Sequence, residues 1–340
     1  MIKYITKDMP QYKANLHSHS NLSDGELSPQ EMKDAYKDHG YSILCITDHE
    51  RTCDHSAMTE PDFLMLTGYE SHLRSAESNG KGSPYVPETH ICLWAKDPHN
   101  VTHINFDSRY CKHAKTPEEI AAIPKAGSVD DRDYSVEYIN NFFKVANEAG
   151  YLCTHNHPVW SLELVERSVS YRGFLSMEIC NYASFAGNRM EYNGPLYDRM
   201  LREGMRVYCH AADDNHNHNP LDSAASDSFG GFTMILAKEL TYPSVIEALE
   251  KGDFYASMGP KILELTFDGN KVHIETEPVR QITMLRGCKS MNRKVGSKEK
   301  PVTCADFIIP DDAPYVRFDV YDFEGNHANT RGFFRDELGI

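Results

Sequence analysis

The stretch SPQEMKDAYKDHGYSILCITDH, residues 28–49, contains a complete helix signal followed by a buried strand. Ser28 is a good N-cap, Pro29 suits the first helical turn and Gly40 suits the helix end. The apolar run within YSILCITDH (41–49) predicts a strand, and Asp48 and His49 come at its carboxyl end. Polar residues placed directly after a strand are typical of α/β proteins, whose sites lie at strand ends.

The same helix–strand unit recurs up to about residue 260. Helices are predicted at 28–40, 136–150, 194–204 and 241–252, with a short one near 117–123, and strands at 41–49, 151–158 and 205–216. Strands that alternate with helices of this length favour parallel βα units. The less regular stretch from 89 to 133 predicts long loops over a site.

The pattern changes after Pro260. KILELTFDGNKVHIETE (261–277) has an Asp-Gly-Asn turn between two alternating segments, which is a strong hairpin signal. Short strands and turns continue to the end of the sequence. We therefore expect two domains, an α/β domain over residues 1–260 and a small, sandwich-like antiparallel β domain over 261–340.

The composition and net charge of the chain exclude some classes of function. The 340 residues carry a formal net charge of −15, which argues against binding the nucleic-acid backbone, since that needs a basic face. Bound metal ions can reverse the local sign, so a small phosphorylated substrate is compatible with this charge. The first residues lack a signal-peptide core, and no apolar run reaches a membrane span of ~18 residues. Nine cysteines without a CxxC pair predict reduced thiols and a cytoplasmic location. No motif predicts the oligomeric state.

Histidines and carboxylates gather at the predicted strand ends. They are His17, His19, Asp24, Asp48, His49, Glu70, His90, His155, His157, Asp213, Asp214 and His216. In a strand, His-x-His and Asp-x-His place both side chains on one face, and such ligands suit Zn, Fe or Mn. One pair alone is a weak signal. Two pairs together with single ligands at other strand ends predict a metal site rather than a chance gathering of polar residues.

Seven short motifs within residues 14–218 resemble the PHP (polymerase and histidinol phosphatase) family. In chain order they are His17-x-His19, Ser23-Asp24-Gly25, Thr47-Asp48-His49, Glu70, His90, His157-Pro158 and Asp214-x-His216. GDFYASMGPKI (252–262) and the β-rich tail also resemble the branch that includes carbaryl hydrolase. The resemblance implies a distorted, TIM-like (β/α)7 barrel with two or three divalent ions (Zn, Mn or Fe) and a C-terminal β domain.

The resemblance also implies a ligand set. The first ion would take His17, His19, Glu70 and Asp214, the second Glu70, His90 and His157, and the third Asp24, His49 and His216. From the residues alone, His155 and His157 share one strand face; the family pattern selects the histidine before proline, His157. Catalytic roles are expected for Glu70, Asp214 and His216. Asp48 is expected to orient a ligand.

The expected activity is hydrolysis of a small-molecule phosphoester by a metal-activated water. Three divalent ions would outweigh the three carboxylates of the set and attract an anion. Candidate substrate contacts are Arg51, His155, Asn181 and Arg189; Arg51 reads equally well as a solvated loop residue. The alternatives are a metallohydrolase of carboxyl or carbamate esters, or a metal-stabilised binding module with little turnover.

Overall fold

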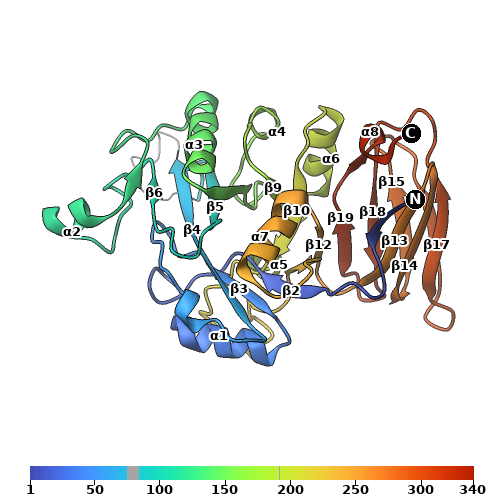
Figure 1. The fold of residues 1–340 in the computed structure, drawn as a ribbon, viewed down its shortest axis with the longest axis horizontal. Helices are drawn as coiled ribbons and strands as arrows, with labels where there is room; N and C mark the ends of the chain where they lie inside the picture. The colour runs from blue at the N-terminus through green and yellow to red at the C-terminus, as the bar shows by residue number, and fades with distance from the viewer. Residues whose placement is uncertain (75–83, 191) are drawn as a thin grey trace.

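The computed structural model describes residues 1–74, 84–190 and 192–340 (Figure 1). Its helices are α1 (Pro29–Asp38), η1 (Ser56–Met58), α2 (Pro117–Ala122), α3 (Val136–Glu148), α4 (Val165–Ser168), α5 (Tyr182–Asn188), α6 (Gly194–Arg202), α7 (Tyr242–Lys251) and α8 (Arg335–Leu338). Its strands are β1 (Ile2–Ile5), β2 (Tyr12–Asn15), β3 (Ile43–Ile46), β4 (Leu64–Arg74), β5 (Glu88–Ala95), β6 (His103–Ile104), β7 (Lys125–Ala126), β8 (Tyr151–His155), β9 (Ser176–Asn181), β10 (Tyr208–Ala212), β11 (Phe232–Ile235), β12 (Phe254–Ser257), β13 (Ile262–Asp268), β14 (Lys271–Val279), β15 (Gln281–Leu285), β16 (Asn292–Val295), β17 (Val302–Ile308), β18 (Tyr315–Tyr321), β19 (His327–Thr330) and β20 (Phe333–Phe334). The helices predicted from the sequence are confirmed.

A large mixed sheet forms the centre of the molecule, in the order β10-β9-β8-β5-β4-β3-β2-β11-β12-β19-β18-β15-β16, with β20 beside β18. β2, β3 and β4 are parallel to one another, and so are β8, β9 and β10. β5 lies antiparallel between β4 and β8. The prediction of parallel βα units is therefore right for two groups of three strands. It is wrong at β5, which pairs directly with the preceding strand of the chain, and at β11, which lies antiparallel to both β2 and β12.

The sheet curls so that its edge strand β10 returns towards β2 and β11. An isolated parallel bridge joins Ser18, after β2, to Asn215, after β10. The Thr233 hydroxyl on β11 donates to the Ala211 carbonyl at 2.8 Å and accepts from the Ala211 amide at 3.2 Å. Within the described ranges the strand ladders do not close into a ring, so the seven-stranded barrel remains a prediction.

The C-terminal residues form antiparallel strands, as expected. β13 and β14 make the predicted hairpin around Gly269. β1, from the other end of the chain, pairs with β13, and β19 pairs with β12 of the large sheet. One hydrophobic cluster contains both Met32 and Ile274, so the apolar core crosses residue 260. The domain division at that residue stays a prediction.

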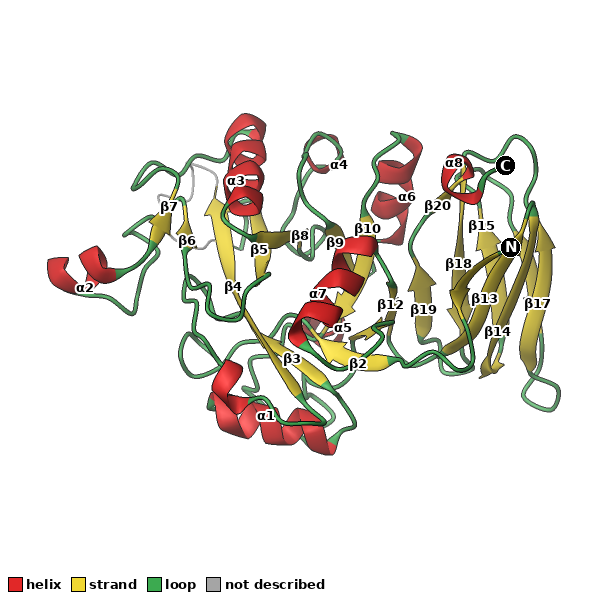
Figure 2. Ribbon diagram, viewed as in Figure 1, coloured by secondary structure: helices red, strands yellow, loops and turns green. Residues whose placement is uncertain are grey.

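Helix α1 shows how local sequence positions the site. The Ser28 side chain accepts from the Glu31 amide while the Glu31 carboxylate accepts from the Ser28 amide, a capping box. The helix buries Met32 and Tyr36. The Tyr36 hydroxyl donates to Asp213 Oδ2 at 2.6 Å, which ties the helix to the segment after β10. Figure 2 shows α1 below the sheet, with α3, α4 and α6 on the opposite side.

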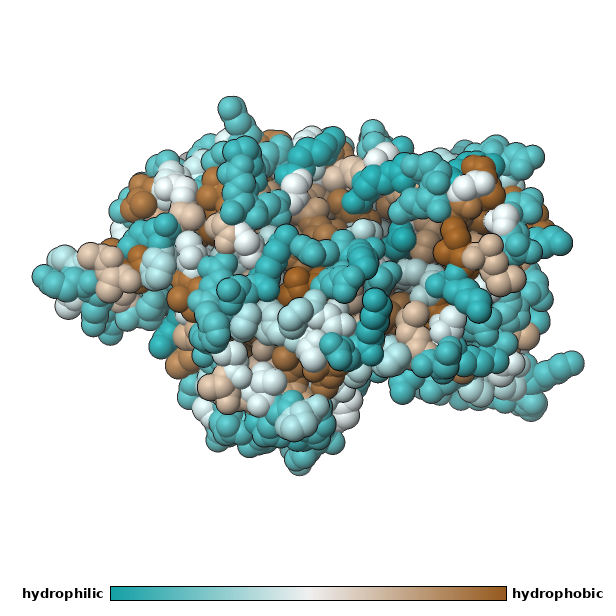
Figure 3. Space-filling model, viewed as in Figure 1, coloured by the Kyte–Doolittle hydropathy of each residue, from teal (hydrophilic) through white to brown (hydrophobic). Residues whose placement is uncertain are grey.

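Hydrophilic residues cover most of the face shown in Figure 3, in keeping with the net charge of −15. Apolar residues appear there in small patches. Across the described ranges, every helix is too short or too polar to span a bilayer.

Candidate metal centre

The two spaced pairs, His17-x-His19 and Asp214-x-His216, lie side by side because of the bridge between Ser18 and Asn215. Backbone bonds fix this register, since the Asp214 amide donates to the His17 carbonyl at 2.9 Å and the His19 amide to the Asn215 carbonyl at 3.0 Å. The bridge thus brings the side chains of the two pairs together, although Asp214 itself has a left-handed backbone with φ 55°. Asp214 Oδ1 lies 3.0 Å from Nε2 of both His17 and His19.

Glu70 on β4 occupies the middle of the histidine cluster and is fully buried. Its Oε1 lies 3.1 Å from His17 Nε2, 3.2 Å from His90 Nδ1 and 3.4 Å from His157 Nε2. Its Oε2 lies 3.0 Å from His49 Nδ1. One carboxylate that faces histidines on several sides is placed to bridge two ions.

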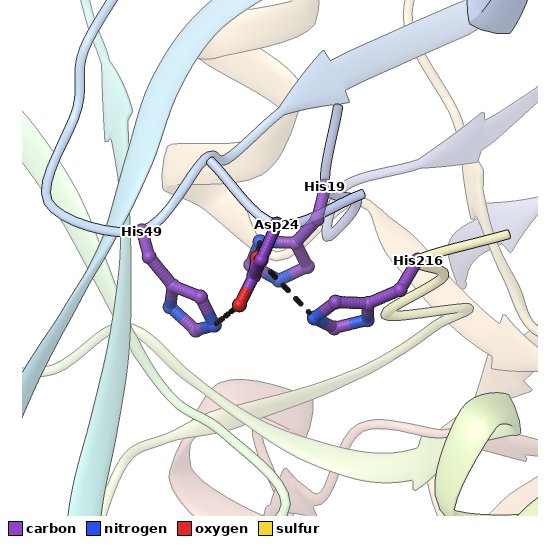
Figure 4. Close-up of side chains that lie close together, drawn as sticks. All are labelled: His19, Asp24, His49 and His216. Carbon is purple, nitrogen blue, oxygen red and sulfur yellow. Dashed lines mark ion pairs between the residues drawn. The ribbon is translucent and has the colours of Figure 1, made fainter. Parts of the chain in front are cut away.

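Asp24 and three histidine rings form the more open side of the centre (Figure 4). Asp24 Oδ2 lies 3.6 Å from His49 Nε2, and Asp24 Oδ1 lies 3.6 Å from His216 Nε2. His19 lies between the rings of His49 and His216, with both centroids at 4.3 Å. The Asp24 side chain is 43% exposed, whereas those of His17 and Glu70 are fully buried. Solvent therefore reaches the centre from the Asp24 side.

Four groups of side chains have ligand atoms within 4.8 Å of one another. They are His19, Asp24, His49 and His216; His17, His19, Glu70 and Asp214; His17, His157 and Glu178; and His49, Glu70 and His90. All nine ligands expected from the resemblance occur in these groups. Unpaired polar atoms also fit a bound cation. Buried polar atoms normally form hydrogen bonds, yet His19 Nδ1 and Glu70 Oε2 form none within the described residues.

The electrostatics of the centre suit cation ligands. Burial would raise the pKa of Glu70, but His17 and His90 outweigh it and lower that pKa. Burial alone would lower the pKa of His90, yet Glu70 raises it to about 10. Burial, with repulsion from His216 and His49, lowers the pKa of His19 to about 3. Glu70 thus stays ionised and His19 neutral, the forms in which carboxylates and imidazoles bind metal, whereas His90 holds a proton that it must release when an ion binds.

Two of these residues adopt a left-handed backbone that side chains disfavour. The φ angles are 25° at His157 and 55° at Asp214. Each such residue costs roughly 1–3 kcal/mol and persists where surrounding bonds hold it. The His157 amide donates to Glu178 Oε2 at 3.0 Å, and the Asp214 amide is held by His17. The turn at each residue aims its side chain into the centre.

Glu178 on β9 is a site residue that the sequence reasoning missed. It is fully buried. Its Oε1 accepts from His17 Nδ1 at 3.1 Å, and its Oε2 accepts from Asn181 Nδ2 at 2.9 Å. An acidic residue inside the apolar strand SMEIC was the signal that could have revealed it, because a buried carboxylate needs partners.

The two aspartates adjacent to ligands hold loops rather than face the centre. Asp48 accepts from the Ser20 amide at 2.8 Å and from the Ser23 hydroxyl at 2.6 Å, which fixes the loop that carries Asp24. This matches the orienting role expected for Asp48. Asp213 accepts from the amides of Phe229, Gly230 and Gly231 and from the Tyr36 hydroxyl.

The four expected substrate contacts occupy different environments. Asn181 is buried, and its Nδ2 donates to Asp214 Oδ2 at 3.1 Å, so it supports the centre from behind. Arg189 is exposed at the end of α5, with its guanidinium 4.1 Å from the Phe185 ring centroid. Arg51 lines a cavity described below, and its Nη1 donates to the Leu22 carbonyl at 3.0 Å. Contact of Arg189 and Arg51 with substrate stays a prediction.

His155 was expected to contact substrate, but it lies in a different environment. Its ring is fully buried, lies 5.4 Å from the Tyr171 ring centroid and meets the Ser168 hydroxyl at 3.1 Å. The strand β8 ends at His155, and the positive φ at His157 then breaks the alternation of side chains. The two histidines therefore do not share a face, and His155 packs in the core instead of beside substrate.

A cavity of about 580 Å³ opens beside Asp24 and His49. Its lining consists of Leu22, Ser23, Asp24, His49, Arg51, His72, Arg74, Arg109, Tyr110, Lys112 and His113. Elsewhere on the centre, Trp160 is 40% exposed and meets the His157 ring edge-on at 5.0 Å. The loop after β6 contributes residues within 109–113 to the cavity wall. The prediction of long loops over 89–133 is therefore right for this segment and wrong where β5, β6 and β7 form.

No protein-family model and no curated protein matches this chain. Among solved structures it is similar to a two-domain protein of Bacteroides vulgatus containing a predicted PHP-like metal-dependent phosphoesterase, with 14% identity, coverage of 97% of this chain and 96% of the other, and a TM-score of 0.46. It is also similar to a putative metal-dependent phosphoesterase of Bifidobacterium adolescentis, with 13% identity, coverage of 63% and 91%, and a TM-score of 0.37. A third is an amidohydrolase of Chromobacterium violaceum with bound sulfate and no metal, with 17% identity, coverage of 60% and 87%, and a TM-score of 0.37. These TM-scores lie below 0.5, and the proposals that follow rest on the side chains of the chain itself.

Proposed function

We propose that this protein is a metal-dependent hydrolase that cleaves phosphoester bonds of a small molecule. We further propose that it belongs to the PHP family, in a branch with a C-terminal β domain. One observation carries the proposal: the nine motif side chains come from six strands or the segments after them and meet in overlapping groups. Their order along the chain matches the family motifs.

The donor set suits two or three divalent ions. His17, His19, Glu70 and Asp214 would hold one ion, and Asp24, His49 and His216 another. For a further ion the resemblance gives Glu70, His90 and His157, and Glu70 Oε1 lies 3.2 Å and 3.4 Å from the two rings. The ligand atoms themselves group differently, with His90 beside His49 and Glu70 and with His157 beside His17 and Glu178. Nitrogen and carboxylate donors fit Zn, Mn or Fe. When bound, such ions supply Lewis acidity for the attack of water on phosphorus.

The chain's own residues set the geometry of that reaction. Glu178 accepts from His17 Nδ1, which leaves Nε2 of that ring as the ligand atom. His216 Nδ1 donates to the Asp214 carbonyl at 3.0 Å, so Nε2 is the ring nitrogen that faces Asp24. Glu70, Asp214 and His216 are the residues to which we assign catalytic roles. The phosphoryl group would approach from the exposed Asp24 side, where water and alcohol can exchange.

The test measures both the metal content and the catalytic turnover of the purified protein. Elemental analysis of purified protein should give about two to three equivalents of Zn, Mn or Fe, and phenyl phosphate or diphenyl phosphate should be hydrolysed in a manner that EDTA abolishes. Asp214→Asn and His17→Ala should lose both properties. His99→Ala is the matched control, because His99 lies outside the four groups with a 74% exposed side chain. Protein that takes up no metal on reconstitution, or an Asp214→Asn variant that keeps metal and turnover, would refute the proposal. Metal with turnover of carboxyl esters alone would move the assignment to carbonyl substrates.

A further inference from the structure

The cavity beside Asp24 and His49 has a cationic wall. Four of its lining residues have basic side chains: Arg51, Arg74, Arg109 and Lys112. Within the described residues, Asp24 is the one carboxylate of the lining, and the proposed function places it on a metal. This concentration of positive charge occurs in a chain whose net charge is −15. A cleft of one sign raises the local concentration of opposite charge, here of anions.

Two of these cations have carboxylate partners behind the wall and two have none. Arg109 Nε donates to Asp107 Oδ1 at 2.8 Å, and Arg74 Nε donates to Glu88 Oε2 at 2.5 Å. In contrast, Arg51 and Lys112 form no ion pair with any other residue of the described ranges. Their charge is therefore available to a ligand in the cavity.

The wall is braced from several strands. Tyr110 meets the His72 ring edge-on at 4.8 Å, and its ring lies 5.6 Å from both the Arg74 and the Arg109 guanidinium. Behind it, buried Arg132 donates to the Glu50 carboxylate and to the His72 carbonyl. The loop residues are thereby fixed against β4, the strand that carries Glu70. Ring contacts and ion pairs therefore hold Arg74 and Arg109 in place, and the Arg51 guanidinium is held by its bond to the Leu22 carbonyl.

We infer that this cavity binds a second anionic group of the substrate, and that Arg51 and Lys112 determine specificity for it. The substrate class is a small phosphoester whose alcohol portion carries a carboxylate or a further phosphate. The inference rests on the proposed function, since it places the reacting phosphoryl group at the Asp24 side of the centre. A volume of about 580 Å³ suits a small metabolite-sized ligand. Guanidinium and ammonium groups bind both kinds of anion through charge-assisted hydrogen bonds.

Kinetics with matched aryl phosphates test the inference. The probes are phenyl phosphate, 4-carboxyphenyl phosphate and 1,4-phenylene bisphosphate, so the last two distinguish a carboxylate from a phosphate as the second group. We expect kcat/KM to be higher for one or both by roughly tenfold or more, the usual effect of a hydrogen bond to a charged group. Lys112→Gln and Arg51→Gln should each reduce that ratio. Lys115→Gln, an exposed residue of the same loop outside the lining, should leave it unchanged.

Binding of non-hydrolysable analogues separates this inference from the proposed function. Calorimetric titration with phenylphosphonate and 4-phosphonobenzoate needs no turnover. We expect 4-phosphonobenzoate to bind roughly tenfold more tightly or better, and Lys112→Gln to remove the difference. Hydrolysis of phenyl phosphate with no preference in rate or affinity for a second anion would overturn the inference and leave the function standing. A clear preference in affinity without hydrolysis of any aryl phosphate would overturn the function and support the cavity as an anion site.

Discussion

Replacing Arg132 with methionine tests whether one buried ion pair holds the cationic wall in place. Arg132 is 9% exposed, and its Nη2 donates to Glu50 Oε2 at 2.8 Å. It also donates to the carbonyls of His72 at 3.1 Å and Asn105 at 2.9 Å. The guanidinium thus joins the segment after β3 to β4 and to the loop after β6.

The expected cost follows from what the substitution leaves behind. Burial would raise the pKa of Glu50, but Arg132 outweighs it and lowers that pKa. Without the guanidinium, the hydrogen bonds that remain to Glu50 among the described residues come from the Ser71 hydroxyl and the His72 amide, both at 3.0 Å. Removing one partner of a buried pair costs about 3–5 kcal/mol. We expect Arg132→Met to lose stability in that range.

Urea unfolding of metal-free protein measures this loss, with circular dichroism and tryptophan fluorescence as two probes of one transition. Glu50→Gln should also destabilise, because it leaves the arginine without its counter-charge. The double variant should be more stable than additivity predicts, by about 0.5–3 kcal/mol. Lys144→Met breaks an exposed pair with Glu148 and should change stability by less than about 1 kcal/mol. An Arg132→Met variant as stable as this control, or strictly additive single variants, would refute the reasoning.

Three further predictions concern the centre and its surroundings. Glu178→Gln weakens the acceptor for His17 Nδ1 and should lower metal affinity by roughly 10–100-fold, measured in competition with a chelating dye. Glu166→Gln, at an exposed position, is the control and should leave metal affinity unchanged. Equal metal affinities of the Glu178→Gln variant and the unaltered protein would count against the role of Glu178. Burial lowers the pKa of His103 from 6.5 to about 4. The unfolded chain therefore takes up this proton first as pH falls from 6.5 towards 4, and stability present above that range should drop by about 3 kcal/mol. His103→Leu should show a smaller loss between pH 7 and pH 5, and an identical slope would argue against this assignment. Divalent ions should slow hydrogen exchange at the amides of His19 and Asp214, which bond across the Ser18–Asn215 bridge. The amides of the β13–β14 hairpin are the control. Exchange at His19 and Asp214 that does not change on adding the ions would contradict ion binding at that bridge.

Local signals in the sequence predicted the elements well. The Ser28 and Glu31 side chains that make the capping box lie three residues apart, and the β13–β14 turn at Gly269 needs only its neighbours. Such features depend on short stretches of chain, so the printed sequence contains all the information they require. The nine expected ligands came from motifs that the chain shares with a family, and each lies on a strand or in the segment that follows one. Their binding of metal stays a prediction.

Contacts between distant parts of the chain could not be predicted in the same way. β1 pairs with β13 across more than 250 residues, and β5 reverses direction against β4. His155 was expected beside substrate because strand periodicity was extended through His157, where the backbone turns. Glu178 lies inside an apolar strand, and its partners there include His17 from the segment after β2 and the His157 amide from the segment after β8. The cationic wall has no periodicity at all, since its residues come from three separate segments.

The position of the ligands along the sheet gives the centre a structural role as well. β10 is the edge of the large sheet, and its return to β2 relies on one bridge and the Thr233 hydroxyl. At that same place, His17 and His19 on one side face Asp214 on the other, with their ligand atoms at about 3 Å. Buried carboxylates without cations repel one another and lose hydration, which opposes folding. Ions between these side chains would therefore join the two edges of the sheet where backbone pairing is sparse. Metal affinity and the stability of this junction are then linked, because any strand movement that separates His19 from Asp214 must also break the coordination.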